Sequence, residues 1–342
     1  MDALNERAIL DSDLPDMARK ALRLCLDGDR DGGLALFRKA LKSPLAYQFP
    51  FVLHAKMLAE SGQIDTAMEL RCLLLRAGAD LNADLCVPGL APDKVCASYE
   101  ALFAAGTINS TMITNYLALR SRMGDADTVA RHMHAGMITA QDLNADLGDP
   151  DGMVDAAKLR DELLAQVDDS MWWGSRQSIR DSYRITFNGD ETEGEIGKLF
   201  AAMRVFTDRY RQSLVEAEPS LLRQSMPDDY HIESWVVISK GPGRVTRHIH
   251  PRGWITGVFY AASPEATWGD DDQGALRIGR PANVDENAPG WPDLTIPPVP
   301  GRLLLMPSHA SHWSIPLKEP GLRIAIAMDV VDDRRGHVGP RV

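Results

Sequence analysis

The sequence predicts a two-domain protein, with an α-helical amino-terminal domain over residues 1–167 and a β-rich carboxyl-terminal domain over residues 168–342. The first half is rich in helix-forming residues, and its apolar residues recur at steps of three and four, as in amphipathic helices. From Met171 onward, short apolar runs alternate with Gly, Pro and Asp, which favours many short strands. A chain of 342 residues is long enough to bury two separate cores.

A Gly-x-x-Asp sequence precedes three of the expected helices, beginning at Gly28, Gly62 and Gly124. We expect the Asp of each copy to be the N-cap residue of its helix. Gly28 and Gly62 are separated by 34 residues, the period of tetratricopeptide repeats, although the third copy is out of register. The region therefore resembles tetratricopeptide-type helical hairpins, and the alternative is an irregular helical domain. As a repeat domain it would bind a substrate or partner protein, or form a homodimer.

Composition and charge narrow the classes of function. The net charge of −11 argues against a nucleic-acid partner, because such proteins need a basic face. No run of eighteen apolar residues is present, so we expect no membrane span, and the amino terminus has no signal-peptide pattern. The four cysteines match no zinc spacing. We expect reduced thiols in a cytoplasmic protein.

The second half predicts one helix and a series of strands that together favour a sandwich or barrel of the jelly-roll, cupin-like type. The helix is expected over residues 193–216. The strands are expected over residues 179–185, 234–239, 254–262, 275–278, 303–306 and 323–331.

The last of these strands carries an arginine on one of its two faces. Side chains alternate along a strand, so one face would present Ile324, Ile326, Met328 and Val330 to the core, and the other Arg323, Ala325, Ala327 and Asp329. A buried arginine needs an anion, because an unpaired buried charge is costly. The small alanines leave room for a carboxylate ligand. The alternative is an internal salt bridge, for example to Asp329.

Three histidines form a candidate metal site. His248 and His250 are two residues apart, so in an extended segment both point the same way, and His312 follows a later strand. Three neutral imidazoles suit Fe(II), Zn(II) or Cu(II). The pair taken alone is weak evidence, because nine histidines in one chain will sometimes fall close together by chance.

Taken together, these segments resemble the iron(II)/2-oxoglutarate-dependent oxygenases, in particular their bacterial and phage branch with His-x-His-Pro. The matching pieces are His-x-His-Pro at 248–251, Ile-Thr-Gly-Val-Phe-Tyr at 255–260, Met-Pro-Ser with a later His at 306–312, and Gly-x-Arg-Ile-x-Ile at 321–326. The ending from Arg323 to Val330 is also similar to the aspartyl/asparaginyl β-hydroxylases. The resemblance covers residues 230–332 and implies a double-stranded β-helix with Fe(II) and 2-oxoglutarate as cofactors.

The resemblance also implies roles for individual residues. His248 would be the first iron ligand, His312 the distal ligand, and Arg323 the anchor for 2-oxoglutarate. His250 occupies the position where most of these enzymes have a carboxylate, and it is either a third ligand or a neighbour of the ligands. No catalytic residue is expected beyond the metal centre.

Further residues are expected around the pocket. Trp254, Thr256 and Tyr260 would share one face of their strand, where Thr256 could donate to a 2-oxoglutarate oxygen. Trp254 and Tyr260 could instead belong to the core. His309 is expected at the rim of the site or beside a ligand.

The function implied is a dioxygenase, a hydroxylase acting on a peptide, protein or amino-acid-derived substrate, which converts 2-oxoglutarate and O2 to succinate and CO2. One alternative is a non-catalytic, metal-containing jelly-roll binding module whose helical domain recruits a partner. Another is a three-histidine dioxygenase that does not need 2-oxoglutarate, which would be favoured if Arg323 paired with an acidic residue of the protein.

Overall fold

The computed structural model describes residues 3–43, 45–46, 49–78, 85, 89–148, 151–167, 179–187, 191–267, 272–318 and 321–332. The chain divides into two compact units, the first within residues 1–119 and the second within residues 120–334. The boundary that we expected at residue 168 falls at a segment outside the described residues. The units divide earlier because residues 139–164 pair or pack with the sheets of the second unit.

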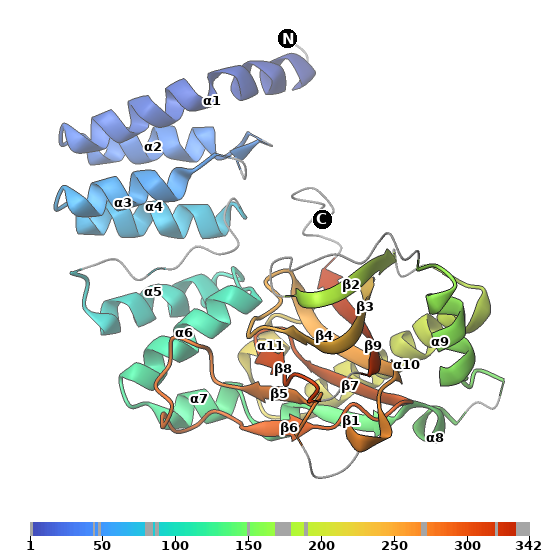
Figure 1. The fold of residues 1–342 in the computed structure, drawn as a ribbon. Helices are drawn as coiled ribbons and strands as arrows, with labels where there is room; N and C mark the ends of the chain where they lie inside the picture. Colours follow the sequence, from blue (N-terminus) through green and yellow to red (C-terminus); the bar gives the residue numbers. More distant parts are fainter. Residues whose placement is uncertain are drawn as a thin grey trace. The chain divides into compact units, whose positions relative to one another are not determined.

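The first unit is built from helices. They are α1 (Ala3–Leu26), α2 (Arg30–Ala40), α3 (Phe51–Glu60), α4 (Ile64–Arg76), α5 (Pro92–Ala104) and the start of α6 (Ser110–Arg122). Helices α1 and α2 form one packed pair and α3 and α4 the next (Figure 1). Phe37 and Phe51, both fully buried, meet edge to face between these pairs with ring centroids 6.1 Å apart. The resemblance to tetratricopeptide repeats stays a prediction.

The Gly-x-x-Asp sequences do begin helices, but the predicted N-cap positions were wrong. Asp31 and Asp127 lie in the first helical turn, whereas the caps are Asp29 and Asp125, each directly after its glycine. Their carboxylates accept hydrogen bonds from the Gly32 and Thr128 amides. Each glycine has a positive φ, near +96° at Gly28, and ends the preceding helix, so the cap comes at once.

The second unit contains two antiparallel sheets and several helices. The large sheet has the order β1 (Thr139–Asp142), β7 (Arg302–Pro307), β4 (Gly253–Ala262), β9 (Leu322–Asp332), β3 (Tyr230–Val245) and β2 (Ile179–Phe187). The small sheet has the order β6 (Leu294–Ile296), β5 (Leu276–Gly279) and β8 (Ser311–Ser314). The helices are α7 (Ala126–His132), α8 (Leu143–Leu147), α9 (Ala156–Leu164), α10 (Gly194–Glu216) and α11 (Leu221–Gln224).

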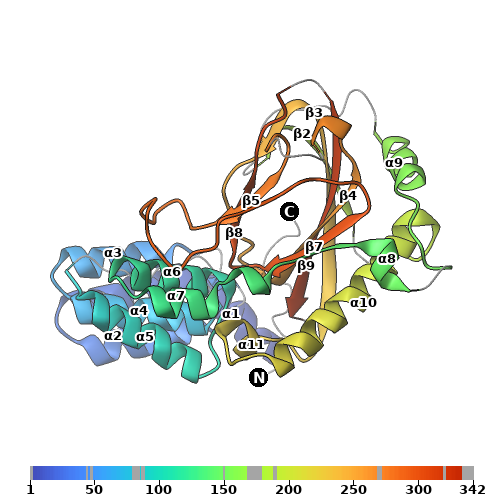
Figure 2. The same cartoon turned by 90° about the horizontal axis from the view of Figure 1, so that it is seen from below.

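The two faces of the large sheet have different neighbours. Figure 2 shows α10 along one side of this sheet and the small sheet on the other. Four side chains of β9 join a buried cluster with Phe200 and other apolar residues of α10: Ile324, Ile326, Met328 and Val330. The predicted alternation of β9 is therefore confirmed, and Arg323 faces the interior between the sheets. Antiparallel sheets arranged in this way are consistent with a jelly roll.

The expected strands of the second half and the helix over 193–216 are confirmed, with ends shifted by one or two residues, except that β3 begins four residues earlier and ends six residues later than expected. The sequence did not predict β6 or β8, the strand that contains His312, nor β1, which lies where a helix was expected. The four residues of β1 pair with the edge of β7, Thr139 opposite Leu305, so tertiary pairing outweighs local helix propensity there.

Two expectations concern the chain as a whole. Cys25, Cys72 and Cys96 are free thiols, and Cys86 lies outside the described residues. None of the helices in the described part of the chain combines the length and apolarity needed to cross a membrane.

The packing of α10 on the large sheet predicts a large effect of core truncation. Phe200→Ala removes a side chain that is 1% exposed, and it should lower the free energy of unfolding by about 3–5 kcal/mol. Val205→Ala on the same helix removes a side chain from a residue that is 40% exposed, and it should cost less than about 1 kcal/mol. Urea unfolding followed by circular dichroism measures both. Equal losses would contradict this placement of the core.

Candidate metal centre

Three histidines meet in the interior between the sheets. His248, in the segment between β3 and β4, forms a two-hydrogen-bond backbone bridge with His312 of β8, both N···O distances being 3.0 Å. The backbone amide of His250 donates to the Ser308 carbonyl at 3.0 Å. One nitrogen from each ring lies within 4.8 Å of the other two. The structure thus brings together the three residues that we expected as metal ligands.

The hydrogen-bond partners of the rings determine which nitrogen carries the hydrogen. Nδ1 of His248 lies 2.8 Å from the Thr246 carbonyl, and Nδ1 of His312 lies 2.9 Å from the Ala310 carbonyl. Nδ1 of His250 lies 2.6 Å from Oδ1 of Asp329. Carbonyl and carboxylate oxygens only accept, so we assign the hydrogen of each neutral ring to Nδ1.

This assignment leaves a lone pair on each Nε2 atom. The Nε2 atoms of His248 and His250 are 3.1 Å apart, which is hydrogen-bond distance, but with both rings assigned as neutral and protonated on Nδ1 neither Nε2 carries a hydrogen to donate. Two facing lone pairs at this distance repel, and a cation between them removes the repulsion. The donor set therefore fits a metal ion.

Burial keeps two of these imidazoles in the neutral form that metals bind. It lowers the pKa of His248 to about 4, and the neighbouring His250 adds to the effect. Burial also places the pKa of His312 well below its usual value, with contributions from both other histidines. Three imidazole nitrogens suit iron, and a six-coordinate ion held by three protein ligands keeps positions for small molecules.

A carboxylate lies directly behind one ring of the group. Asp329 of β9, paired in register with Thr256 of β4, accepts from Nδ1 of His250 and from the Thr256 hydroxyl at 2.8 Å. The Thr256 oxygen is also 2.8 Å from the Ser308 hydroxyl. The hydrogen that we expected Thr256 to offer 2-oxoglutarate is donated to Asp329 here. Sequence reasoning saw Asp329 only as a salt-bridge partner of Arg323 and missed Ser308.

Arg323 is the second charged group of this interior, and it is 3% exposed. Its guanidinium donates to the carbonyls of Gly274 and Gly243, each at 3.1 Å, and to the Ser314 hydroxyl at 3.3 Å. Within the described residues, no carboxylate lies within ion-pair distance of it, so the alternative of an internal salt bridge is not found there. Ser314 and His312 share one face of β8, so Arg323 borders the same interior as the histidines.

Small side chains and a second hydrogen-bond donor lie near Arg323. Ala325 and Ala327, on the same face of β9, remain partly exposed although they lie between the sheets. Tyr260 of β4 also faces this side and interacts electrostatically with Arg323. Burial raises the pKa of the Tyr260 hydroxyl to about 12, and the guanidinium acts in the opposite direction. A neutral phenol and a guanidinium are both donors to a carboxylate.

Trp254 does not share a face with Thr256. The pairing of β4 with β9 shifts register between Gly253 and Ile255, and this places Trp254 in the apolar cluster on the helical side. Its indole N–H donates to the Leu222 carbonyl at 2.8 Å. A bulge of this kind is not visible in an alternating pattern, so sequence reasoning missed it.

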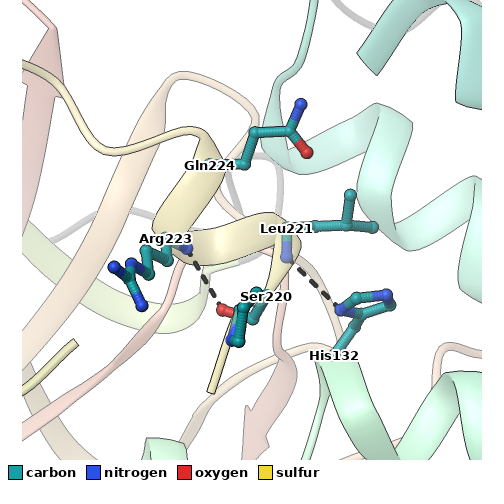
Figure 3. A pocket seen from close by; sticks show the side chains of 6 residues that line it. His132, Ser220, Leu221, Arg223 and Gln224 are labelled. Carbon is teal, nitrogen blue, oxygen red and sulfur yellow. Dashed lines mark hydrogen bonds between the residues drawn. The ribbon is translucent and has the colours of Figure 1, made fainter. Parts of the chain in front are cut away.

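His309 lies outside the histidine group. It is 1% exposed, and its Nε2 is 3.2 Å from the carbonyl of His132, the last residue of α7. His132 in turn accepts the Leu221 amide hydrogen on Nδ1 at 3.3 Å, at the edge of a hollow of about 460 Å³ (Figure 3). The hollow is lined by His132, Pro219, Ser220, Leu221, Arg223 and Gln224.

The comparison with protein families gives one match. Residues 233–329 match the family described as "Putative 2OG-Fe(II) oxygenase". This segment contains the three histidines, Arg323 and Asp329. The match supports a 2-oxoglutarate- and Fe(II)-dependent oxygenase domain, and the family implies Fe(II) and 2-oxoglutarate as cofactors. No curated protein matches the chain.

Among solved structures, the chain is similar to several oxygenases at low identity. A prolyl-4-hydroxylase of Pseudomonas putida has 14% identity, with 60% of this chain and 96% of that chain covered, at a TM-score of 0.41. A prolyl hydroxylase of Trichoplax adhaerens, in complex with a hypoxia inducible factor peptide fragment, has 17% identity, with 65% and 94% covered, at a TM-score of 0.40.

The buried His309 predicts a pH dependence of stability. Burial lowers its pKa in the folded state to about 4, whereas an unfolded histidine titrates near about 6.5. A depressed folded pKa means that the contribution is complete above the unfolded pKa and is lost as the pH falls toward the folded pKa. Between pH 7 and pH 4, the wild type should lose about 3 kcal/mol more free energy of unfolding than His309→Gln.

Urea unfolding at a series of pH values measures this difference. The exposed His134 provides the matched control, because His134→Gln should leave the pH dependence of the wild type unchanged. A parallel pH dependence of wild type and His309→Gln would contradict the prediction.

Proposed function

We propose that the chain is an Fe(II)/2-oxoglutarate-dependent oxygenase with a double-stranded β-helix, and that it hydroxylates a peptide, protein or amino-acid-derived substrate. The reaction would convert 2-oxoglutarate and O2 to succinate and CO2. One observation carries the proposal: the buried guanidinium of Arg323, which has no carboxylate partner among the described residues, borders the same interior as three convergent imidazole lone pairs. A cation site and an anion site are thus placed beside each other.

His248, His250 and His312 would hold the iron, and their Nδ1 hydrogen bonds fix the ring orientations before the metal binds. When bound, Fe(II) supplies the activation of O2 that oxidises an unactivated C–H bond. The protein residues bind, orient and exclude water. The backbone bridge between His248 and His312 keeps two of the ligands at a fixed separation.

Arg323 and Tyr260 would bind the distal carboxylate of 2-oxoglutarate. The present partners of the guanidinium are neutral oxygens, so its charge is solvated but not neutralised. A carboxylate would neutralise it through charge-assisted hydrogen bonds. Ala325 and Ala327 would leave the space that the carbon chain of the ligand needs.

The two alternative functions lead to different predictions for Arg323 and for 2-oxoglutarate turnover. A three-histidine dioxygenase without 2-oxoglutarate would be supported by an acidic partner for Arg323, and none is found in the described part of the chain. A non-catalytic binding module would show no turnover of 2-oxoglutarate. A homodimer or partner-binding role of the helical region stays a prediction.

The proposal predicts uncoupled turnover. The anaerobically iron-loaded chain, given 2-oxoglutarate and then O2, should release succinate without added substrate. His248→Ala and His312→Ala should abolish succinate formation, because each removes a ligand. Arg323→Ala should raise the KM for 2-oxoglutarate at least about thirtyfold, since losing a buried charged partner costs roughly 2 kcal/mol or more. Succinate is quantified by mass spectrometry.

Arg211→Ala provides the matched control for Arg323→Ala. Arg211 lies on α10 and donates to the carbonyls of Pro227 and Asp228, so its loss should leave the KM unchanged. Absence of succinate from wild-type protein with confirmed iron content would refute the proposed function.

Tyr260→Phe tests the second donor at the anion site. Removing the hydroxyl should raise the KM for 2-oxoglutarate by about three- to tenfold, the value of one hydrogen bond, with little change in kcat. Tyr183→Phe, at a buried tyrosine of β2, is the control and should leave the KM unchanged. An unchanged KM in Tyr260→Phe would place the hydroxyl outside the 2-oxoglutarate site.

A further inference from the structure

The three histidines differ in the group that accepts the hydrogen bond from Nδ1. Nδ1 of His248 and Nδ1 of His312 each donate to a neutral backbone carbonyl. Nδ1 of His250 donates to the carboxylate of Asp329 at 2.6 Å. A carboxylate acceptor makes an imidazole a stronger ligand, because it stabilises the partial positive charge that the ring gains on binding a cation. Of the three, His250 is the ring whose Nδ1 faces a carboxylate.

Asp329 has no Lys or Arg side chain within ion-pair distance in the described part of the chain. Its side chain is 10% exposed, and its hydrogen-bond partners are Nδ1 of His250 and the Thr256 hydroxyl. Burying a carboxylate without a positive partner is costly. The histidine group itself contains no carboxylate, so a divalent ion held there would also lack a counter-charge among its ligands.

Neighbouring residues keep Asp329 within hydrogen-bond distance of His250. A Cβ atom at Gly253 would lie 2.4 Å from the Ser308 Oγ and 3.1 Å from the Asp329 Cγ, so only glycine leaves room for this hydroxyl–carboxylate network. Trp235 stacks on the His250 ring, with centroids 5.5 Å apart and planes 19° apart. The ring is thus fixed on its face and at Nδ1, and only Nε2 is directed toward the other histidines.

We infer that Asp329 is a positioning residue that supplies, through the His250 ring, the negative charge that the three nitrogen ligands do not bring to the metal. Thr256, with Ser308 beside it, orients the carboxylate toward Nδ1. The inference rests on the metal site of the proposed function, but it concerns metal affinity and electronic structure and does not require 2-oxoglutarate turnover.

Asp329→Asn removes the negative charge of this side chain but keeps its size and shape. The amide oxygen can still accept from His250, but the negative charge is gone. The dissociation constants for Co(II) and, under anaerobic conditions, Fe(II) should rise about ten- to a hundredfold in calorimetric titrations of the full chain. The visible absorption bands of the Co(II)-loaded protein should shift, which loss of a purely structural contact would not cause.

Two further variants complete the test. Asp332→Asn removes a carboxylate from the same strand, three residues further along, and should leave Co(II) affinity and spectrum unchanged. Thr256→Val keeps the Asp329 charge but removes its orienting donor, and should weaken Co(II) binding by about three- to tenfold, the worth of one hydrogen bond. This variant also serves as the test if Asp329→Asn does not fold.

The outcomes separate the inference from the proposed function. Unchanged Co(II) affinity and spectrum in folded Asp329→Asn, or in Thr256→Val if only that variant folds, would overturn the inference. Equal weakening by Asp332→Asn would overturn it as well, because the effect would then be one of net charge. If the wild type forms no succinate, the proposed function is refuted. The metal-binding result for Asp329 would still hold in that case.

Discussion

The candidate site depends on the backbone bridge between His248 and His312. Its two hydrogen bonds attach the segment between β3 and β4 to β8, and so join the large sheet to the small one at the histidines. His248 and His312 need no flexible side-chain reach to meet, because their backbones are already paired. His250, two residues after His248 in an extended segment, is directed to the same side. The convergence of the three histidines is therefore a consequence of strand pairing.

Strand β9 organises the charges of this interior. Arg323 and Asp329 lie on the same face of the strand with Ala325 and Ala327 between them. Six residues of extended chain separate the Cα atoms of Arg323 and Asp329 by roughly 20 Å along the strand, whereas the long Arg323 side chain reaches Ser314 of β8, two residues after His312. Arg323 and Asp329 do not pair with each other, and each has other partners instead: carbonyls and a hydroxyl at Arg323, an imidazole and a hydroxyl at Asp329. One end of the face is suited to an anion and the other to a cation.

Much of this arrangement could be predicted from alternation and spacing. The inward direction of Arg323 followed from period two, and the convergence of His248 and His250 followed from the same rule. The partner of Asp329 could not be predicted, because it depends on how β4 and β9 align in register across more than seventy residues of chain. The place of Trp254 depends on a single register shift. Neither feature leaves a local signal in the sequence.

The expectation for the helical half failed in detail for a related reason. Asp29 and Asp125 were overlooked as caps because the sequence pattern counted from glycine to the second Asp, whereas a left-handed glycine ends one helix and the next begins at once. Strand β1 was missed because its four residues have no period of their own and gain hydrogen bonds only from β7. In both cases geometry beyond the local window decides the assignment.

The two buried charges of β9 also explain why a metal and a dicarboxylate belong to the same interior. Within the described residues, Asp329 has no Lys or Arg and Arg323 no Asp or Glu within ion-pair distance, which is unfavourable for two buried charges. A divalent cation at the histidines compensates Asp329 and leaves an excess positive charge, and a dianion at Arg323 removes that excess. The charges of Asp329, Arg323, the divalent cation and the dianion sum to zero when both ligands are present, whereas either ligand alone leaves a net charge. Each ligand should therefore bind more favourably when the other is already in place, because either one alone leaves a net charge in a low-dielectric interior.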